Sequence, residues 1–93
     1  MFVGSLKVEV FIPGSRSLED RRSVLSSLKE RVKNRCNASV AEVGETDLWQ
    51  RATLAVAIVG GGHSHVAEQL DAAARLLESD PRAEILSIER DIR

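Results

Sequence analysis

Hydrophobic and polar positions alternate at the start of the chain. The apolar side chains fall on even positions, at Phe2, Leu6, Val8, Val10 and Ile12. Period two is typical of a half-buried β-strand, because successive side chains point to opposite faces of a sheet. The pattern predicts a strand over residues 2–12. Pro13 and Gly14 end it, since proline cannot donate to a strand ladder and glycine adopts turn geometry easily.

The spacing then becomes that of a helix. Ser17 is placed as an N-cap, and Asp20 stands three residues later in the capping-box position. The apolar residues that follow at helical intervals are Leu18, Leu25, Leu28 and Val32. The pattern predicts a helix to about Asn34, which leaves the chain through Arg35, Cys36 and Asn37.

Two strands joined by a short turn come next. Residues 37–43 form a short alternating run, residues 44–47 have turn composition, and residues 49–59 alternate again. In the longer run the larger apolar side chains are Ala52, Leu54, Val56 and Ile58, and the other face is small. Two strands this close in sequence are expected to pair as a hairpin.

A second helix and a last strand complete the chain. Three glycines at 60–62 precede an apolar stripe formed by Val66, Leu70, Ala73 and Leu77. This spacing predicts a helix with Ser64 near its cap, and Pro81 ends it. Residues 85–92 then read as a strand, with Leu86, Ile88 and Ile92 on one side.

The predicted order is therefore βαββαβ. Two right-handed crossovers around a central hairpin give an α+β ferredoxin-like sandwich, with a four-stranded antiparallel sheet and both helices on one face. The first and third strands are expected to be central. The 93 residues suffice for a single domain, residues 1–93, with one core.

Composition adds limits to this picture. Apolar residues make up 43% of the chain and charged residues 29%, which is ordinary for a globular protein. No apolar run reaches the ~20 residues that a membrane-spanning helix needs, and the first residues do not resemble a signal peptide. The single cysteine, Cys36, excludes an internal disulfide and fits a reducing compartment. We expect a cytoplasmic protein without membrane association.

Charge is distributed unevenly. Residues 16–35 hold seven bases and three acids, a balance of +4, whereas residues 36–93 hold five bases and ten acids, a balance of −5. Such asymmetry bears on partners rather than on fold. The bases that could contact the phosphates of a nucleic acid are Arg16, Arg21, Arg22, Lys29 and Lys33. A solvated basic face is the alternative.

Candidate chemistry is otherwise sparse. His63 and His65 are too few for a zinc site, which takes three or four ligands. The glycines at 60–62 lack the spacing of a phosphate-binding loop. Glu42, Glu45 and Asp47 could hold a hard cation, although turns collect such residues anyway. No nucleophile stands beside a base, so we expect no metal, no cofactor and no enzymatic activity.

The uncovered face of the sheet offers a second kind of surface. Phe11, Trp49 and Arg51 are expected near one another on that face and are candidate interaction residues. An aromatic beside an arginine can stack a nucleic-acid base. A lone tryptophan is more typical of the end of a core or of a seam between protein chains.

Two blocks of the sequence resemble a known family. They are the run from Pro13 to Leu25, with Pro-Gly-Ser-Arg-Ser-Leu and Arg-Arg, and Val40-Ala41-Glu42-Val43 followed by Asp47-Leu48-Trp49-Gln50-Arg51-Ala52. In them the chain is similar to the YlxP-like family of small bacterial proteins. The resemblance implies a bacterial cytoplasmic protein with a ferredoxin-like fold. It also implies gene neighbours that act in transcription termination, translation initiation and ribosome maturation. It supplies no catalytic residues. Where that family has a lysine, this chain has Glu19, which weakens an anion site at the helix start.

Three functions remain open from the sequence. The first is a non-enzymatic module that associates with RNA or ribosomal components through the basic helix. The second is a protein-interaction or homodimerisation module that uses the open sheet face. The third is a small-ligand regulatory domain, for which fold analogy is the only argument.

Overall fold

The sheet and helices follow the predicted order. The structure is a computed structural model that describes residues 1–44 and 48–93. Its elements in chain order are β1 (Phe2–Phe11), α1 (Leu18–Arg35), β2 (Ser39–Val43), β3 (Arg51–Gly60), α2 (His63–Glu78) and β4 (Glu84–Ile92).

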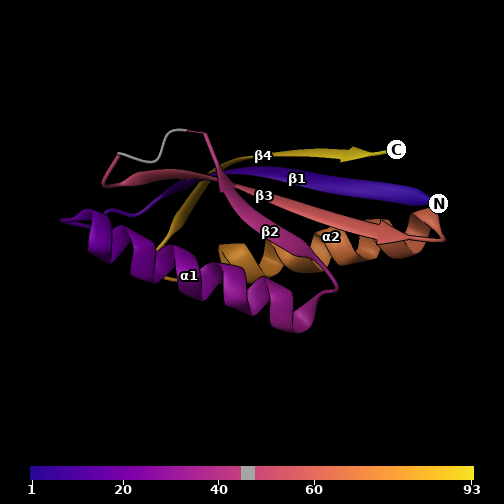
Figure 1. Cartoon of the computed structure of the whole chain (residues 1–93), viewed down its shortest axis with the longest axis horizontal. Coiled ribbons are helices and arrows are strands. Elements are labelled where there is room, and N and C mark those ends of the chain that lie inside the picture. The colour runs from indigo at the N-terminus through magenta and orange to yellow at the C-terminus, as the bar shows by residue number, and fades with distance from the viewer. Residues whose placement is uncertain (45–47) are drawn as a thin grey trace.

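The four strands form one antiparallel sheet in the order β2-β3-β1-β4. Both helices lie on the same face of this sheet, and within the described residues no helix covers the other face (Figure 1). The two central strands pair without interruption from Phe2 opposite Gly60 to Phe11 opposite Arg51. The ferredoxin-like βαββαβ prediction is confirmed. Neither helix is long and apolar enough to span a membrane.

The core lies between the sheet and the helices. The even positions of β1 and β3 face the apolar stripes of the two helices, and the side chains with no exposed surface include Val8, Val10, Leu54, Val56, Leu28, Val66 and Leu70. Burial of a side chain of this size contributes about 1.5–3 kcal/mol. Cys36 is buried at the end of α1, and burial raises the pKa of its thiol.

The start of α1 is capped almost as predicted. The Asp20 backbone N–H donates to the Ser17 hydroxyl at 3.1 Å. In return the Asp20 carboxylate accepts from the N–H of Arg16 at 3.0 Å, one residue earlier than a capping box requires. The second helix differs from the prediction. Gly62 is its N-cap and makes no side-chain hydrogen bond, and Ser64 lies inside the first turn.

A β-bulge in the pairing of β1 with β4 changes which residues of β4 face the core. The register with β1 shifts between Glu9 and Val10, so that Ile85 comes to lie opposite Val10. Ile85 packs against the core, and Leu86 is 46% exposed. Ile88 is 36% exposed as well, so of the three residues expected on one side of this strand only Ile92 packs against the core, and the bulge adds Ile85 to it.

Gly4 and Gly60 allow α2 to approach the sheet closely. A Cβ at Gly4 would lie 2.6 Å from a methyl of Val66 and 2.8 Å from a methyl of Leu70, and both side chains are fully buried. A Cβ at Gly60 would lie 2.9 Å from the other Val66 methyl. These contacts have no room to move aside, so the glycines are required by packing.

Gly4→Ala is therefore expected to destabilise the protein by about 1 kcal/mol through overpacking. Gly61→Ala is the control, since a Cβ there meets nothing within 4 Å and the residue does not have a positive φ. Urea unfolding of both variants gives the comparison. Equal stabilities would show that α2 shifts without cost.

Candidate nucleic-acid interface

The basic helix α1 presents different residues to the core and to solvent. Its buried stripe consists of Arg21, Leu25, Leu28 and Val32. Arg22 and Lys33 are exposed, and Lys29 is partly exposed. On a helix with about 100° between residues, these three bases lie on one flank next to the buried stripe.

Arg21 belongs to the interior instead. Its side chain is 5% exposed, and its Nε donates to the backbone oxygen of Arg51 at 3.0 Å. Its Nη1 donates to a carboxylate oxygen of Glu42 at 3.0 Å. The Nη2 and the second oxygen lie 2.6 Å apart, too bent for a hydrogen bond but in close charge contact. The expectation that Arg21 contacts phosphates was therefore wrong, because its charge is already neutralised by Glu42 in the interior.

A sequence signal for this pair exists. Arg21 precedes Leu25, Leu28 and Val32 at intervals of four, seven and eleven, which is the inward stripe of the helix. Glu42 stands two residues after Val40, on the inward alternation of β2 and opposite Leu54. Opposite charges at two inward positions indicate a buried ion pair, since an unpaired buried charge is very costly.

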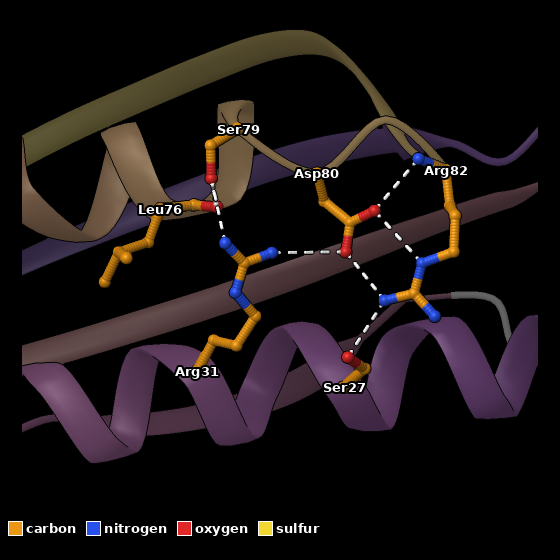
Figure 2. Close-up of polar contacts among 6 residues, drawn as sticks. All are labelled: Ser27, Arg31, Leu76, Ser79, Asp80 and Arg82. Carbon is orange, nitrogen blue, oxygen red and sulfur yellow. Dashed lines mark hydrogen bonds and ion pairs between the residues drawn. The ribbon is translucent and has the colours of Figure 1, made fainter.

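A second basic residue of α1, Arg31, is paired with the buried acid Asp80. Asp80 follows α2, is 3% exposed, and accepts from Arg31 at 3.3 Å and from Arg82 at 2.7 Å (Figure 2). Arg82 also donates to the hydroxyl of Ser27, and Arg31 donates to that of Ser79 at 3.0 Å. Hydrogen bonding to Arg82 lowers the pKa of Asp80 to about 2. The cluster fastens α1 to the loop between α2 and β4.

Three other basic residues of α1, Arg22, Lys29 and Lys33, point away from this cluster. Arg31 reaches toward the end of α2, and the flank of Arg22, Lys29 and Lys33 lies more than about 150° around the helix from it. Within residues 1–44 and 48–93, none of these three bases takes part in an ion pair. Arg16 is exposed just before the helix. We call Arg22, Lys29 and Lys33 the basic flank.

The candidate interaction residues differ in exposure. Phe11 is half-buried and lies opposite Arg51, whose side chain is exposed. Trp49 is 57% exposed and precedes β3, which begins at Arg51. The expectation that Trp49 belongs to the third strand was therefore wrong. Its exposure also excludes a role in closing the end of the core.

Gln50 was missed by the sequence analysis. Its side-chain Nε2 donates to the backbone oxygens of Pro13, at 3.1 Å, and Ser15, at 3.3 Å. The backbone N–H of Ile12 donates to the backbone oxygen of Gln50 at 2.8 Å. Gln50 therefore ties the loop before α1 to the start of β3. Pro13 and Ser15 belong to one of the two sequence blocks that resemble a known family, and Gln50 belongs to the other. That both blocks resemble the same family was the sequence signal that could have pointed to this contact.

Other candidate chemistry finds little support in the geometry. His63 packs edge-to-face on Phe2, with ring centroids 5.6 Å apart. Glu42 is occupied by Arg21, and Glu45 and Asp47 lie outside the described residues. No group of three potential metal ligands occurs in the described part of the chain.

Two hollows lie beside α1. One, of about 470 Å³, is lined by Pro13, Gly14, Ser15, Asp20 and Arg82, among others. Its charged groups are engaged, Asp20 by the Arg16 N–H and Arg82 by Asp80. The other, of about 420 Å³, is lined by Arg35, Ala72, Arg75, Leu76 and Ser79 and so adjoins both helices.

Comparisons with known proteins agree with this architecture. Two designed proteins share the fold. Foldit4 has a TM-score of 0.52 at 13% identity, over 99% of this chain and 94% of that one. LFR1 1, described as having a ferredoxin fold, has a TM-score of 0.52 at 14% identity, over 100% of this chain and 86% of that one. Designed proteins at this identity show the fold alone.

Sequence relatives identify the family. The uncharacterised protein YlxP of Bacillus subtilis strain 168 is 30% identical over 82 residues, which cover 88% of this chain and 89% of that protein. Residues 3–90 match the family described as protein of unknown function DUF503. The YlxP-like resemblance is thus confirmed, and the chain belongs to the DUF503 family.

Proposed function

We propose that this chain is a non-enzymatic RNA-binding module that contacts RNA phosphates through the basic flank of α1. The observation that carries the proposal is the selective pairing of charges. Folding neutralises Arg21 with Glu42 and Arg31 with Asp80, whereas Arg22, Lys29 and Lys33 stay together without acidic partners among the described residues. A polyanion would neutralise what the fold leaves unpaired.

The spacing of the flank suits a phosphate backbone. Arg22 and Lys29 are seven residues apart, or about 10 Å along the helix axis, and Lys33 follows one turn later. Three phosphate contacts on a single strand give a slope of about −2 in a plot of log affinity against log salt. Affinity should therefore fall about 15-fold between about 50 mM and about 200 mM salt.

The open sheet face is less suited to self-association. The charged side chains Lys7 and Glu89 are opposite each other in its middle, and Glu9 accepts from the hydroxyl of Thr53 at 2.9 Å. Asp91 stands farther along the same face of β4. A second copy packed on this face would have to desolvate these charges, which is costly unless each finds a partner. Solvation of this face is the simpler expectation.

The proposal is tested by Lys33→Glu with Arg75→Glu as its matched control. Both bases lie in the last turn of their helix, so both changes oppose the helix dipole equally. Lys33→Glu is expected to weaken RNA binding several-fold and to reduce the salt slope by about 1. Arg75→Glu should leave both quantities unchanged. Fluorescence anisotropy of a labelled RNA measures the affinities.

Two outcomes would contradict the proposal. Absence of RNA binding by the unmodified chain at about 50 mM salt would remove the function itself. Equal weakening by Arg75→Glu would place the contact at the hollow lined by Arg35 and Arg75 rather than on the basic flank.

A further inference from the structure

We infer that the RNA is single-stranded and that Trp49 stacks on one of its bases. This inference rests on the proposed function and adds the class of nucleic acid that the surface takes. It begins from the unusual exposure of the chain's only tryptophan, 57% of which is in contact with solvent. A large aromatic left outside the core is a frequent mark of a recognition surface.

The backbone that carries Trp49 is fastened on its C-terminal side. Gln50 is held by three hydrogen bonds to the segment before α1: its backbone oxygen accepts from the Ile12 N–H, and its side-chain Nε2 donates to the backbone oxygens of Pro13 and Ser15. The Arg51 oxygen accepts from the buried Arg21 at 3.0 Å. The indole is thus attached to a pinned segment. Less conformational freedom is lost when a ligand binds to such a residue.

The same hydrogen bonds place the segment that carries Trp49 beside segments that carry exposed arginines. Gln50, which follows Trp49, is bonded to Ser15, which precedes Arg16. Arg51 is bonded to Arg21, which precedes Arg22. Arg16, Arg22 and Arg51 are all exposed. The pinned segment that carries Trp49 therefore adjoins the loop before α1 and the start of that helix, from which the basic flank continues.

The chemistry of this combination favours single strands. In a duplex the faces of the bases are covered by their stacked neighbours, and a protein reads mainly backbone and shape. An unpaired base has a free π-face that an indole can cover, while cations follow the phosphates. Among the described acids nearby, Glu42 is neutralised by Arg21, whereas Asp20 accepts only from the backbone N–H of Arg16 and keeps its charge. Glu19 and Asp20 remain as exposed acids beside three exposed arginines, which still leaves an excess of positive charge, so an anionic partner is favoured over a neutral peptide.

Trp49→Ala tests the inference, and Val59→Ala is its control. Val59 is 54% exposed near the other end of β3, so both changes truncate an exposed apolar side chain. The probes are a mixed-sequence RNA of roughly 12 nucleotides and the duplex of the same sequence. Trp49→Ala is expected to weaken single-strand binding at least about fivefold and to leave duplex binding unchanged. Trp49→Phe should retain part of the affinity, and Val59→Ala all of it.

The intrinsic fluorescence of Trp49 gives an independent readout, since no other tryptophan contributes. Quenching by the single strand and not by the duplex supports the inference. If both RNAs bind and both respond to Lys33→Glu, but Trp49→Ala changes neither, the stacking inference fails and the proposed function stands. If neither RNA binds, the proposed function fails first. If Trp49→Ala alters only the sedimentation of the protein, the tryptophan belongs to a protein contact and the inference is overturned.

Discussion

Arg21→Ala is expected to lower the free energy of unfolding by about 3–5 kcal/mol. The side chain is 5% exposed, and its removal leaves the carboxylate of Glu42, 18% exposed, without its cation. The same change removes the donor to the Arg51 oxygen. The cost therefore comes mainly from an unpaired charge in a poorly hydrated place, more than from the lost attraction itself. Urea unfolding followed by circular dichroism measures the difference.

Arg22→Ala is the matched control for this prediction. It removes the same kind of side chain one position later, where the guanidinium is exposed and has no acidic partner in the described part of the chain. Its effect should stay within about 0.5 kcal/mol. Similar losses at both positions would mean that helix propensity, and not the buried pair, determines the effect.

The double variant Arg21→Met, Glu42→Leu separates the two causes further. Replacement of both partners by apolar side chains leaves no buried charge, so much of the lost stability should return. The Arg51 oxygen then still lacks its side-chain donor, and recovery should be incomplete for that reason. A double variant as unstable as Arg21→Ala would show that the ion pair itself contributes the stability.

Periodicity alone was sufficient for most of the fold. The alternation in β1 and β3 and the helical stripes in α1 and α2 reflect burial on one face of each element, and the structure confirms those faces. Side-chain contacts between elements are a different matter. The place of Arg21 was missed because its type, a base in a basic helix, outweighed its position on the inward stripe.

Two other features could not follow from local pattern. The bulge opposite Glu9 and Val10 is a property of how two strands pair, so the residues of β4 alone do not encode that Ile85 lies opposite Val10. The exposure of Trp49 contradicts the usual preference of aromatic side chains for partial burial. The bulge is set by strand pairing, and the segment that carries Trp49 is held by the hydrogen bonds of the Gln50 side chain.

Asp80→Asn is expected to destabilise the protein by about 2 kcal/mol at neutral pH. The carboxylate is 3% exposed and accepts hydrogen bonds from the side chains of Arg31 and Arg82 and from the Arg82 backbone N–H. Its pKa is about 2 in the folded protein and 3.8 in its ordinary state. A difference of this size corresponds to about 2.5 kcal/mol. The two arginines are 41% and 47% exposed, so solvent screening reduces that value somewhat.

The effect of Asp80→Asn should depend on pH in a defined direction. Because the pKa of Asp80 is depressed by folding, its contribution is fully present above the unfolded value and is lost as pH falls from about 4 toward 2. The stability difference between the unmodified protein and Asp80→Asn should therefore be constant from about pH 5 to 7 and shrink by roughly half near pH 3.

Asp91→Asn provides the control for the ion-pair cluster that Asp80 forms with Arg31 and Arg82. Asp91 also pairs with an arginine two residues later, Arg93, but their side chains are 53% and 85% exposed. The loss at Asp91 should stay within about 0.5 kcal/mol. A pH-independent effect of Asp80→Asn would show that it acts through packing and not through charge, since an asparagine oxygen can still accept from the Arg82 N–H. Burial, and not sequence spacing, then decides which of two similar Asp-x-Arg pairs joins α1 to the end of α2.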